Sequence, residues 1–430
     1  MNKPSKSHYS IAVYCGFLGL TCIAGLAPAA LTFAIDPYEA FDNTRHSKTD
    51  RELAEKSHYP LWKFTHYSGQ ADTVILGDSR ARALRDKYWH EFGATQAYNF
   101  AYGGGTIPEI HATFRQIKNN PNLKHLVVGI QLRSFDENHK GGLNRVPEAI
   151  TATASHVNYL KNWFVARKSW EFFVRKNPKL VSTANTLTPS LIPAAHASDL
   201  GRPGTTEIKT LLLPDVCFGC DLPEYDSSEF VWRSKGPNLG LGRGKHFDLW
   251  STSRTGSVRV LPAKFERQVT KNARSDWKTF RFSRRYFAMM SEMADWADAD
   301  PERSLIFVIP PTIVEMQRTI ADYGLAAMNL SLRRRLAGLA PVIDFDFANP
   351  VTRDLSNFSD AYHFNSKLAR LIVGEVLMMQ GANSIQAQRV AKRRSKLTCP
   401  SDFANAVPTA DAPGDYWQGK ACRIWTGAKK

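Results

Sequence analysis

Two short motifs lie far apart in the chain and together hold a serine, an aspartate and a histidine. The first is Thr73-Val74-Ile75-Leu76-Gly77-Asp78-Ser79-Arg80, and the second is Asp360-Ala361-Tyr362-His363. A serine hydroxyl becomes a nucleophile when a histidine removes its proton and an acid holds that histidine in one tautomer. We therefore predict Ser79 as the nucleophile, His363 as the general base and Asp360 as the acid that orients it.

The sequence around Ser79 is typical of a turn between a buried strand and a helix. Residues 74–76 are β-branched or aliphatic, which suits a buried parallel strand, and residues 80–92 carry apolar residues in a helical pattern. A helix that begins near Ser79 would offer free amides and the positive end of its dipole to an oxyanion. A lone Gly-Asp-Ser is more often an ordinary helix cap, so this motif needs the second one.

The second motif has a spacing that suits its chemistry. Asp360 and His363 are three residues apart, so the carboxylate can reach the imidazole. Residues 365–379 have apolar residues at helical spacing, which places the pair in a loop before the last predicted helix. The simpler alternative is that Asp360 caps this helix and His363 is a surface residue.

Strands and helices alternate along the chain, and a long irregular segment interrupts them. We predict strands near 73–76, 98–101, 125–131, 304–310 and 342–345, with helices at 110–118, 280–297 and 313–340. This order predicts an α/β fold with a doubly wound parallel sheet, whose binding crevice lies at the carboxyl ends of its strands. We divide the chain into segments 1–36, 37–137, 138–272, 273–385 and 386–430, the third being the insertion and the last a tail.

The two motifs resemble those of the SGNH hydrolase family, also called GDSL-like, over roughly Ala71 to Gly381. The resemblance implies a three-layer α/β/α sheet fold and the same roles for Ser79, Asp360 and His363. It also implies that Gly104 or its neighbour Gly103, in a run of three glycines, donates a backbone amide to the oxyanion. Glycines also suit a chain that approaches a substrate closely, although they are equally found in flexible turns.

One family feature is missing, because no Gly-x-Asn-Asp follows the third predicted strand. The chain has Gln131-Leu132-Arg133-Ser134-Phe135-Asp136 there instead. Gln131 or Arg133 would substitute as the side-chain donor, or backbone amides alone would serve at a cost in rate. Arg80, next to the nucleophile, is a further candidate for binding the oxyanion or the substrate.

The pattern is closer to the membrane-anchored branch of SGNH-like proteins, which includes DltD-like proteins and proteins that acylate exopolysaccharides. The segment 35–38, Ile-Asp-Pro-Tyr, also resembles that branch. The resemblance implies a serine-dependent O-acyl transferase or esterase, acetyl being the favoured group, that acts on a cell-surface polysaccharide. The alternatives are a non-catalytic assembly or carbohydrate-binding component of a polysaccharide export machine, and DltD-like handling of D-alanyl esters.

An uncharged apolar stretch, Ile11 to Ile35, is long enough to cross a bilayer. Lys3 and Lys6 precede it, which predicts a cytoplasmic amino terminus and a single-pass protein of the bacterial inner membrane with a periplasmic catalytic domain. A signal peptide cleaved near Ala29 is the alternative. One span cannot carry acyl groups across the membrane, so a transferase would need a multi-span acyltransferase or polysaccharide synthase as partner, or an exported donor.

Charge and cysteine content agree with an exported protein. Lysine and arginine number 56 against 40 acidic residues, which gives a net charge of +16. Outside the membrane this charge favours lipid head groups or acidic polysaccharide as partners over nucleic acid.

In an oxidising compartment Cys217 could pair with Cys220, and Cys399 with Cys422, while a zinc site built from the four is a weaker alternative. We predict no metal and no cofactor. The tryptophans of the insertion, which could stack on sugars, are expected to cover its own small core: Trp163, Trp170, Trp232 and Trp250.

Overall fold

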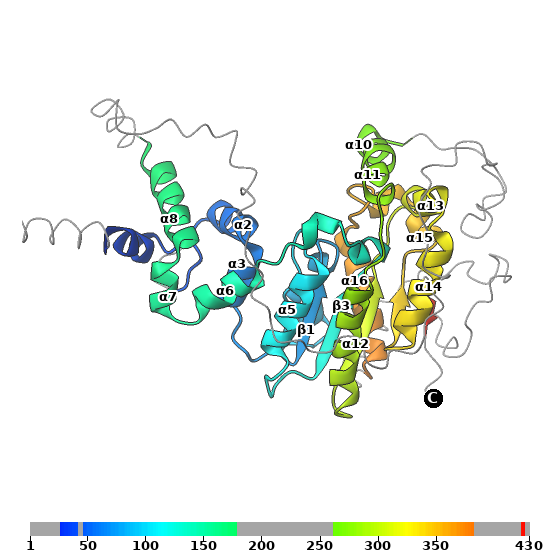
Figure 1. Ribbon diagram of the computed structural model, residues 1–430, viewed down its shortest axis with the longest axis horizontal. Helices are drawn as coiled ribbons and strands as arrows, with labels where there is room; N and C mark the ends of the chain where they lie inside the picture. The colour runs from blue at the N-terminus through cyan, green and yellow to red at the C-terminus, as the bar shows by residue number, and fades with distance from the viewer. Residues whose placement is uncertain (1–25, 42–45, 179–260, 382–422, 426–430) are drawn as a thin grey trace, which may run out of the picture. The chain divides into compact units, whose positions relative to one another are not determined.

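The computed structural model describes residues 26–41, 46–178, 261–381 and 423–425 (Figure 1). They fall into two compact units. The described part of the first unit consists of residues 26–41, 46–51 and 154–178. The second unit holds residues 52–153, 261–381 and 423–425, and it contains the sheet and all three predicted triad residues.

The second unit is built on a sheet whose strand order is β2-β1-β3-β4-β5-β6. The strands are β1 (Thr73–Gly77), β2 (Ala97–Asn99), β3 (His125–Gly129), β4 (Ser304–Ile309), β5 (Val342–Asp344) and β6 (Arg423–Trp425). The first five are parallel and β6 is antiparallel to β5. Every residue of β1 is buried, as expected for a strand covered on both faces. The predicted α/β class and parallel sheet are confirmed.

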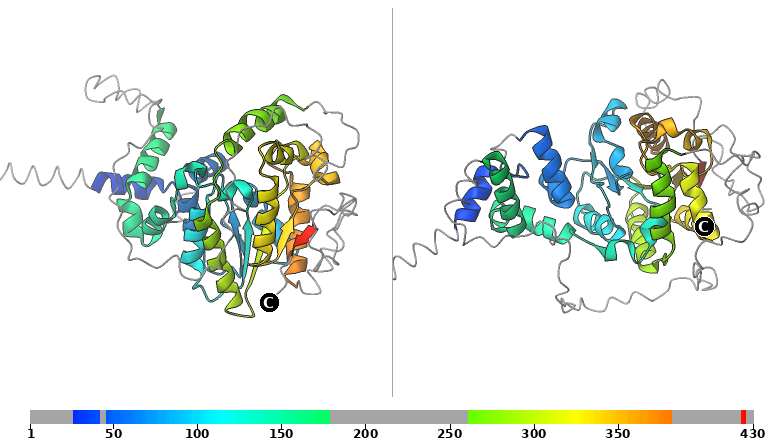
Figure 2. Two further views of the ribbon diagram at one scale, coloured as in Figure 1. Left: turned by 45° about the vertical axis from the view of Figure 1, so that its right-hand side comes forward. Right: turned by 90° about the horizontal axis from the view of Figure 1, so that it is seen from above.

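Helices cover both faces of the sheet. The helices after each strand include α4 (Asp86–Glu91), α5 (Ile107–Ile117), α12 (Arg284–Asp298), α13 (Val314–Asp322), α14 (Ala326–Ala337) and α16 (Ser366–Met379). Helices α5 and α12 pack on each other and on β1 and β4, whereas α4 packs on α16. Figures 1 and 2 show α5 and α12 on one side of the strands and α16 on the other. Helical crossovers between parallel strands place helices on the faces of the sheet in this way.

Shorter elements complete this unit. They are α3 (Tyr59–Thr65), α6 (Val146–Thr153), α10 (Ala263–Arg267), α11 (Ala273–Trp277) and α15 (Pro350–Arg353), with 3₁₀ turns η1 (Ala81–Ala83), η2 (Leu132–Phe135), η3 (His139–Gly142) and η6 (Leu355–Asn357) and a π turn η5 (Gln268–Asn272). Helix α2 (Lys48–Ser57) spans the boundary between the units, and the first unit also holds α7 (His156–Lys161), α8 (Trp163–Lys176) and helical residues 26–35.

The strand order reverses direction at β1, between the carboxyl ends of β2 and β3. From β1 the chain goes to β2 on one side and then returns to β3 on the other, and ligands bind where an open α/β sheet reverses in this way. The backbone is crowded there, because a Cβ on Gly77 would lie 2.6 Å from the carbonyl oxygen of Gly129. Gly77 also has a φ of +143°, which favours glycine. Ser79 follows two residues later.

Two expectations about secondary structure need correction. The helix expected over residues 313–340 is two helices, α13 and α14, because Gly324 between them has a φ of +75°, which a continuous helix does not allow. Strand β6 was not predicted, since three residues near the end of the tail show no periodicity that would reveal them. It nevertheless pairs with β5 and extends the sheet.

In the first unit, residues 35–38 form a turn that is held by the side chain of Asp36. Asp36 is fully buried with a φ of 43°, and its carboxylate accepts hydrogen bonds from the amides of Ala40 and Phe41 at 2.8 and 2.9 Å. The hydroxyl of Tyr159 on α7 also donates to it, at 3.0 Å. Asp36 therefore fixes the turn that follows helical residues 26–35 and joins it to α7.

Several predictions fall on parts of the chain that the structure does not describe. The cysteines Cys217, Cys220, Cys399 and Cys422 lie there, as do Trp232, Trp250 and most of the predicted anchor at residues 11–35. Within the described ranges, no helix is both long and apolar enough to span a bilayer. Trp163 and Trp170 are 76% and 54% exposed on α8, so they do not form the small core that we expected.

Candidate active site

The structure brings Ser79, His363 and Asp360 together at the carboxyl end of β1. The hydroxyl oxygen of Ser79 lies 2.8 Å from Nε2 of His363. On the other side of the ring, Nδ1 of His363 lies 2.9 and 3.0 Å from the two carboxylate oxygens of Asp360. A proton can therefore pass from the serine to Nε2 while Nδ1–H stays bound to the carboxylate, which is the arrangement that activates a serine.

The loop before α16 is held in a defined shape. Phe358 and Phe364 pair as an antiparallel bridge, and the amide of Ala361 donates to the side-chain oxygen of Gln268 at 2.8 Å. The Asp360 carboxylate accepts the amides of Tyr362 and His363 at 3.0 Å each. Although burial raises the pKa of Asp360, the hydrogen bonds from the His363 ring and these amides outweigh it and hold the pKa well below its usual range. Asp360 is therefore ionised.

Asp78 and Arg80 form a buried ion pair that reaches Gln131. The guanidinium of Arg80, which is 3% exposed, binds both carboxylate oxygens of Asp78 and donates through Nη1 to the side-chain oxygen of Gln131. Burial raises the pKa of Asp78, but the adjacent Arg80 brings it below its ordinary value. Because Arg80 occupies the oxygen of Gln131, the side-chain NH₂ group is left to donate, and it has no acceptor among the described residues.

The glycine run lies directly against the end of β1. A Cβ on Gly105 would be 2.7 Å from the carbonyl oxygen of Gly77, and the amide of Tyr102 donates to that oxygen at 3.4 Å. The amides of Ser79, Gly103 and Gly104 donate no hydrogen bond within the described part of the chain. With the Gln131 side chain, these amides form a set of unused donors at the carboxyl ends of β1, β2 and β3.

The helix expected to begin near Ser79 does not form there. Ser79 lies in a turn followed by η1, and α4 begins only at Asp86. The side-chain amide of Asn99, at the end of β2, donates to the carbonyl oxygens of Ala81 and Leu84 at 2.9 and 2.8 Å, so these oxygens are not used in a continuing helix. The expected contribution of a helix dipole to the oxyanion is therefore wrong, and individual amides remain.

Arg133 does not take the place of the missing asparagine, because it is bound to another group. Its guanidinium forms an ion pair at 3.0 Å with Asp276 on α11. The hydroxyl of Tyr362 donates to the other oxygen of Asp276 at 3.1 Å. Arg133 thus supports the loop that carries His363 through Asp276 and Tyr362, and Gln131 is the better candidate for an oxyanion donor.

We predict that Arg133→Ala makes stability depend more steeply on pH. Burial raises the pKa of Asp276, and Arg133 opposes this rise, so without Arg133 the folded carboxyl binds its proton more tightly. The folded state then holds more protons than the unfolded state above pH ~3.9, and the free energy of unfolding falls as pH rises. Urea unfolding should show a loss of about 1–3 kcal/mol at pH 7 and a smaller loss at pH 4.5. The double variant with Asp276→Asn should lack this pH dependence, whereas equal losses at both pH values would contradict the prediction.

Sequence reasoning missed the lysines at this site. Lys140 donates through Nζ to the carbonyl oxygen of Gly104 at 2.9 Å. Lys264 on α10 donates to the carbonyl oxygen of Ser359 at 3.0 Å and lies 3.4 Å from the Asp360 carboxylate. For Lys140 the sequence offers one local signal, the two glycines at 141–142, which are typical of a turn. No local pattern would have indicated Lys264.

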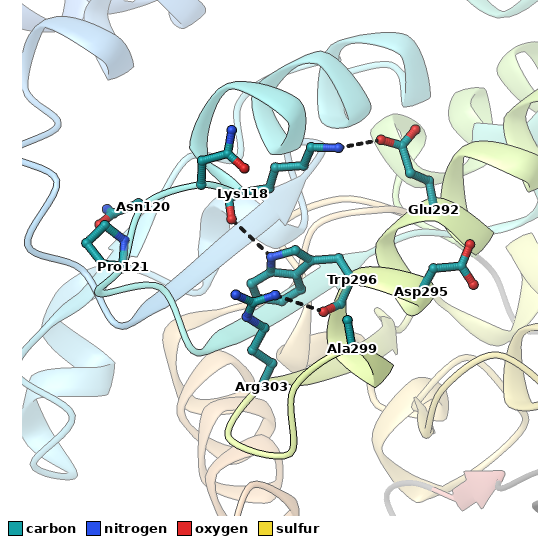
Figure 3. Close-up of a pocket in the computed structure, with 9 residues that line it drawn as sticks. Lys118, Asn120, Pro121, Glu292, Asp295, Trp296, Ala299 and Arg303 are labelled. Carbon is teal, nitrogen blue, oxygen red and sulfur yellow. Dashed lines mark hydrogen bonds and ion pairs between the residues drawn. The ribbon is translucent and has the colours of Figure 1, made fainter. Parts of the chain in front are cut away.

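A separate groove of about 530 Å³ lies at the other end of the strands from Ser79 (Figure 3). It is formed by the carboxyl ends of α5 and α12, which precede β3 and β4, so it is at the amino ends of these strands. Trp296 donates from its indole to the carbonyl oxygen of Lys118 at 3.0 Å, and Arg303 covers its ring. The residues that line it include no serine, cysteine or histidine, and we assign it no chemistry.

Comparison with known proteins adds no relative. No protein-family model, no curated protein and no solved structure matches the chain. In the described ranges, no group of three or more histidine, cysteine, aspartate or glutamate side chains is placed to hold a metal ion. The function is therefore inferred from the geometry around Ser79.

Proposed function

We propose that the protein is an SGNH-type serine esterase or O-acyltransferase that acts on a cell-surface polysaccharide outside the cytoplasm, with acetyl as the favoured acyl group. The observation that carries the proposal is the 2.8 Å contact between the Ser79 hydroxyl and Nε2 of His363, whose Nδ1 is bound to Asp360. The position of this contact at the reversal point of a parallel sheet, in the usual ligand crevice, supports it further.

The chemistry follows from the positions of these atoms. As Ser79 Oγ bonds to the acyl carbon, its proton moves to Nε2 of His363, and the carbonyl oxygen becomes an oxyanion. The amides of Ser79 and Gly104 and the side-chain NH₂ of Gln131 are the donors for this oxygen. When the intermediate collapses, the alcohol of the donor leaves with the proton from His363. The acyl group then remains on Ser79 as an ester.

The second half of the reaction uses the same groups in reverse. A sugar hydroxyl or water loses its proton to Nε2 of His363 and attacks the acyl-serine, which frees the Ser79 hydroxyl. Acceptance by a sugar is transfer, and acceptance by water is hydrolysis. For transfer, the acyl group must already be on the outer side of the membrane, so we propose a multi-span membrane partner or an exported acyl donor.

Labelling with a fluorophosphonate probe tests this proposal. We expect the purified full-length protein to be labelled at Ser79 within minutes, as shown by peptide mass spectrometry, because the probe traps only serines activated by a base. Ser79→Ala should abolish labelling. Ser291→Ala, which removes a half-buried hydroxyl on α12, should leave it unchanged. A protein that binds glycan but is not labelled would favour the non-catalytic scaffold instead.

A further inference from the structure

Two cations lie near the glycine run, one by way of Tyr59 and one by direct contact. Arg82, in η1 just after the nucleophile, donates from Nη1 to the hydroxyl of Tyr59 at 3.0 Å, and its guanidinium lies 5.3 Å from the centroid of that ring. The Tyr59 hydroxyl in turn would be 3.0 Å from a Cβ on Gly103. Tyr59, stacked on Tyr102 at 5.7 Å, therefore holds Arg82 beside Gly103.

Lys140 contacts the run directly at Gly104. Its ammonium donates to the carbonyl oxygen of Gly104, and any Cβ on Gly104 would overlap that nitrogen. The backbone of Lys140 has a φ of 52°, which is uncommon for a residue other than glycine and costs about 1 kcal/mol. Only glycine at position 104 thus permits this placement of the lysine, whose ammonium lies against the backbone.

Neither Arg82 nor Lys140 has a carboxylate within ion-pair distance among the described residues. Three arginines of the same region do have such a partner: Arg80 pairs with Asp78, Arg133 with Asp276, and Arg145 with Glu109. The positive charge of Arg82 and Lys140 is therefore not neutralised locally. An anion bound at Gly103 and Gly104 would lie near both charged donors and against bare glycine backbone.

The titration of nearby groups is consistent with a local excess of positive charge. Burial and the neighbouring Arg145 lower the pKa of Lys140. Burial, Arg133 and Lys140 lower the pKa of His139 to about 4, so this histidine is neutral at pH 7 and adds no charge. A bound anion would stabilise the charged form of Lys140 and relieve its repulsion with the arginines.

We propose that Arg82 and Lys140 form a subsite for an anionic group, a carboxylate or a phosphate, on the glycan that exchanges its acyl group at Ser79. The inference rests on the proposed function for its link to acyl transfer, but the binding itself does not require a reactive serine. Arginine suits this role because its guanidinium can donate two hydrogen bonds to one carboxylate or phosphate. The substrate class is thus an acidic rather than a neutral glycan.

Equilibrium binding to three defined oligomers tests the subsite in the full-length protein carrying Ser79→Ala, which prevents turnover. The probes are oligogalacturonate, a glycerol phosphate oligomer and neutral maltohexaose. We expect one of the acidic oligomers to bind at least about tenfold more tightly than maltohexaose, and its identity distinguishes a carboxylate from a phosphate. Loss of one charged hydrogen bond, in Arg82→Met or in Lys140→Gln, should weaken that binding by about tenfold or more.

The control is Arg85→Met, which removes an exposed arginine three residues further along and should leave binding unchanged. Urea unfolding of each variant shows whether the fold is retained, and Lys140→Gln keeps a polar side chain of similar length. Equal affinity for acidic and neutral oligomers, or unchanged affinity in both variants, would overturn the subsite. Because Ser79 is absent from these measurements, failure of the subsite is distinct from failure of Ser79 to react with a fluorophosphonate.

Discussion

Replacing Ser79 or His363 with alanine is expected to lower kcat for hydrolysis of 4-nitrophenyl acetate by at least about a thousandfold. The expectation follows from the direct contact of these two side chains, because neither the nucleophile nor the base functions without the other. A stopped or continuous assay of 4-nitrophenolate release measures the effect. The free energy of unfolding should change little, since both side chains are only half-buried and neither fills the core.

The double variant decides whether the two residues act as a unit. Ser79→Ala with His363→Ala should be no slower than either single variant, because the first loss already removes the shared step. If the loss of kcat in the double variant equals the product of the two single losses, the residues act independently. As a matched control, His90→Ala removes an exposed histidine at the end of α4 and should retain full activity. If wild type and Ser79→Ala hydrolyse the ester at the same rate, Ser79 is not the nucleophile.

The sequence predicted the parallel sheet and the meeting of the two motifs because both depend on local signals. Buried parallel strands read as apolar runs, as in β1, β3 and β4, and each is followed by a helical pattern. Parallel strands joined by helices leave their carboxyl ends at one edge. A serine after β1 and a histidine in the loop after β5 were therefore expected to lie near each other, 284 positions apart in the chain.

The remaining features depend on contacts that no local pattern reveals. Asn99 interrupts the helix expected after Ser79 by binding carbonyl oxygens 18 and 15 positions earlier in the chain. Arg133 was a candidate donor by its position, but Asp276 binds it from a distant helix. Lys140 binds the carbonyl oxygen of Gly104, 36 positions earlier in the chain, from a backbone with a positive φ. In each case the partner is far away in sequence, so residue type and spacing could not identify the pair.

Gln131 shows how the structure narrows a choice that the sequence left open. Gln131 and Arg133 were equal candidates for the missing asparagine, and both follow β3 at the reversal point of the sheet. In the structure, Arg133 forms an ion pair with Asp276. The side-chain oxygen of Gln131 accepts a hydrogen bond from Arg80. Arg80 is in turn fixed by Asp78, so a buried ion pair positions the amide that would meet the oxyanion. We infer that Arg80 acts as a positioning residue and Gln131 as the donor.

Gln131→Ala is accordingly expected to lower kcat for ester hydrolysis by about a hundredfold while KM changes little. Removal of one oxyanion donor has an effect of this size because the donor binds the transition state more tightly than the substrate. Gln131→Glu should be similarly slow, since a carboxylate beside Arg80 presents no N–H. Gln116→Ala, an exposed glutamine on α5, is the matched control and should be fully active.

Arg80 is expected to affect kcat indirectly, by orienting the Gln131 side chain. In Arg80→Lys, the ammonium cannot bind Asp78 and Gln131 together as the guanidinium does, so the Gln131 side chain loses its fixed orientation. We expect kcat to fall by about tenfold, and a second substitution, Gln131→Ala, to cost less in this background than in wild type because the two losses overlap. If the losses multiply in full, Arg80 does not act through Gln131. If Gln131→Ala alone leaves kcat within about twofold of wild type, Gln131 is not an oxyanion donor and backbone amides serve instead.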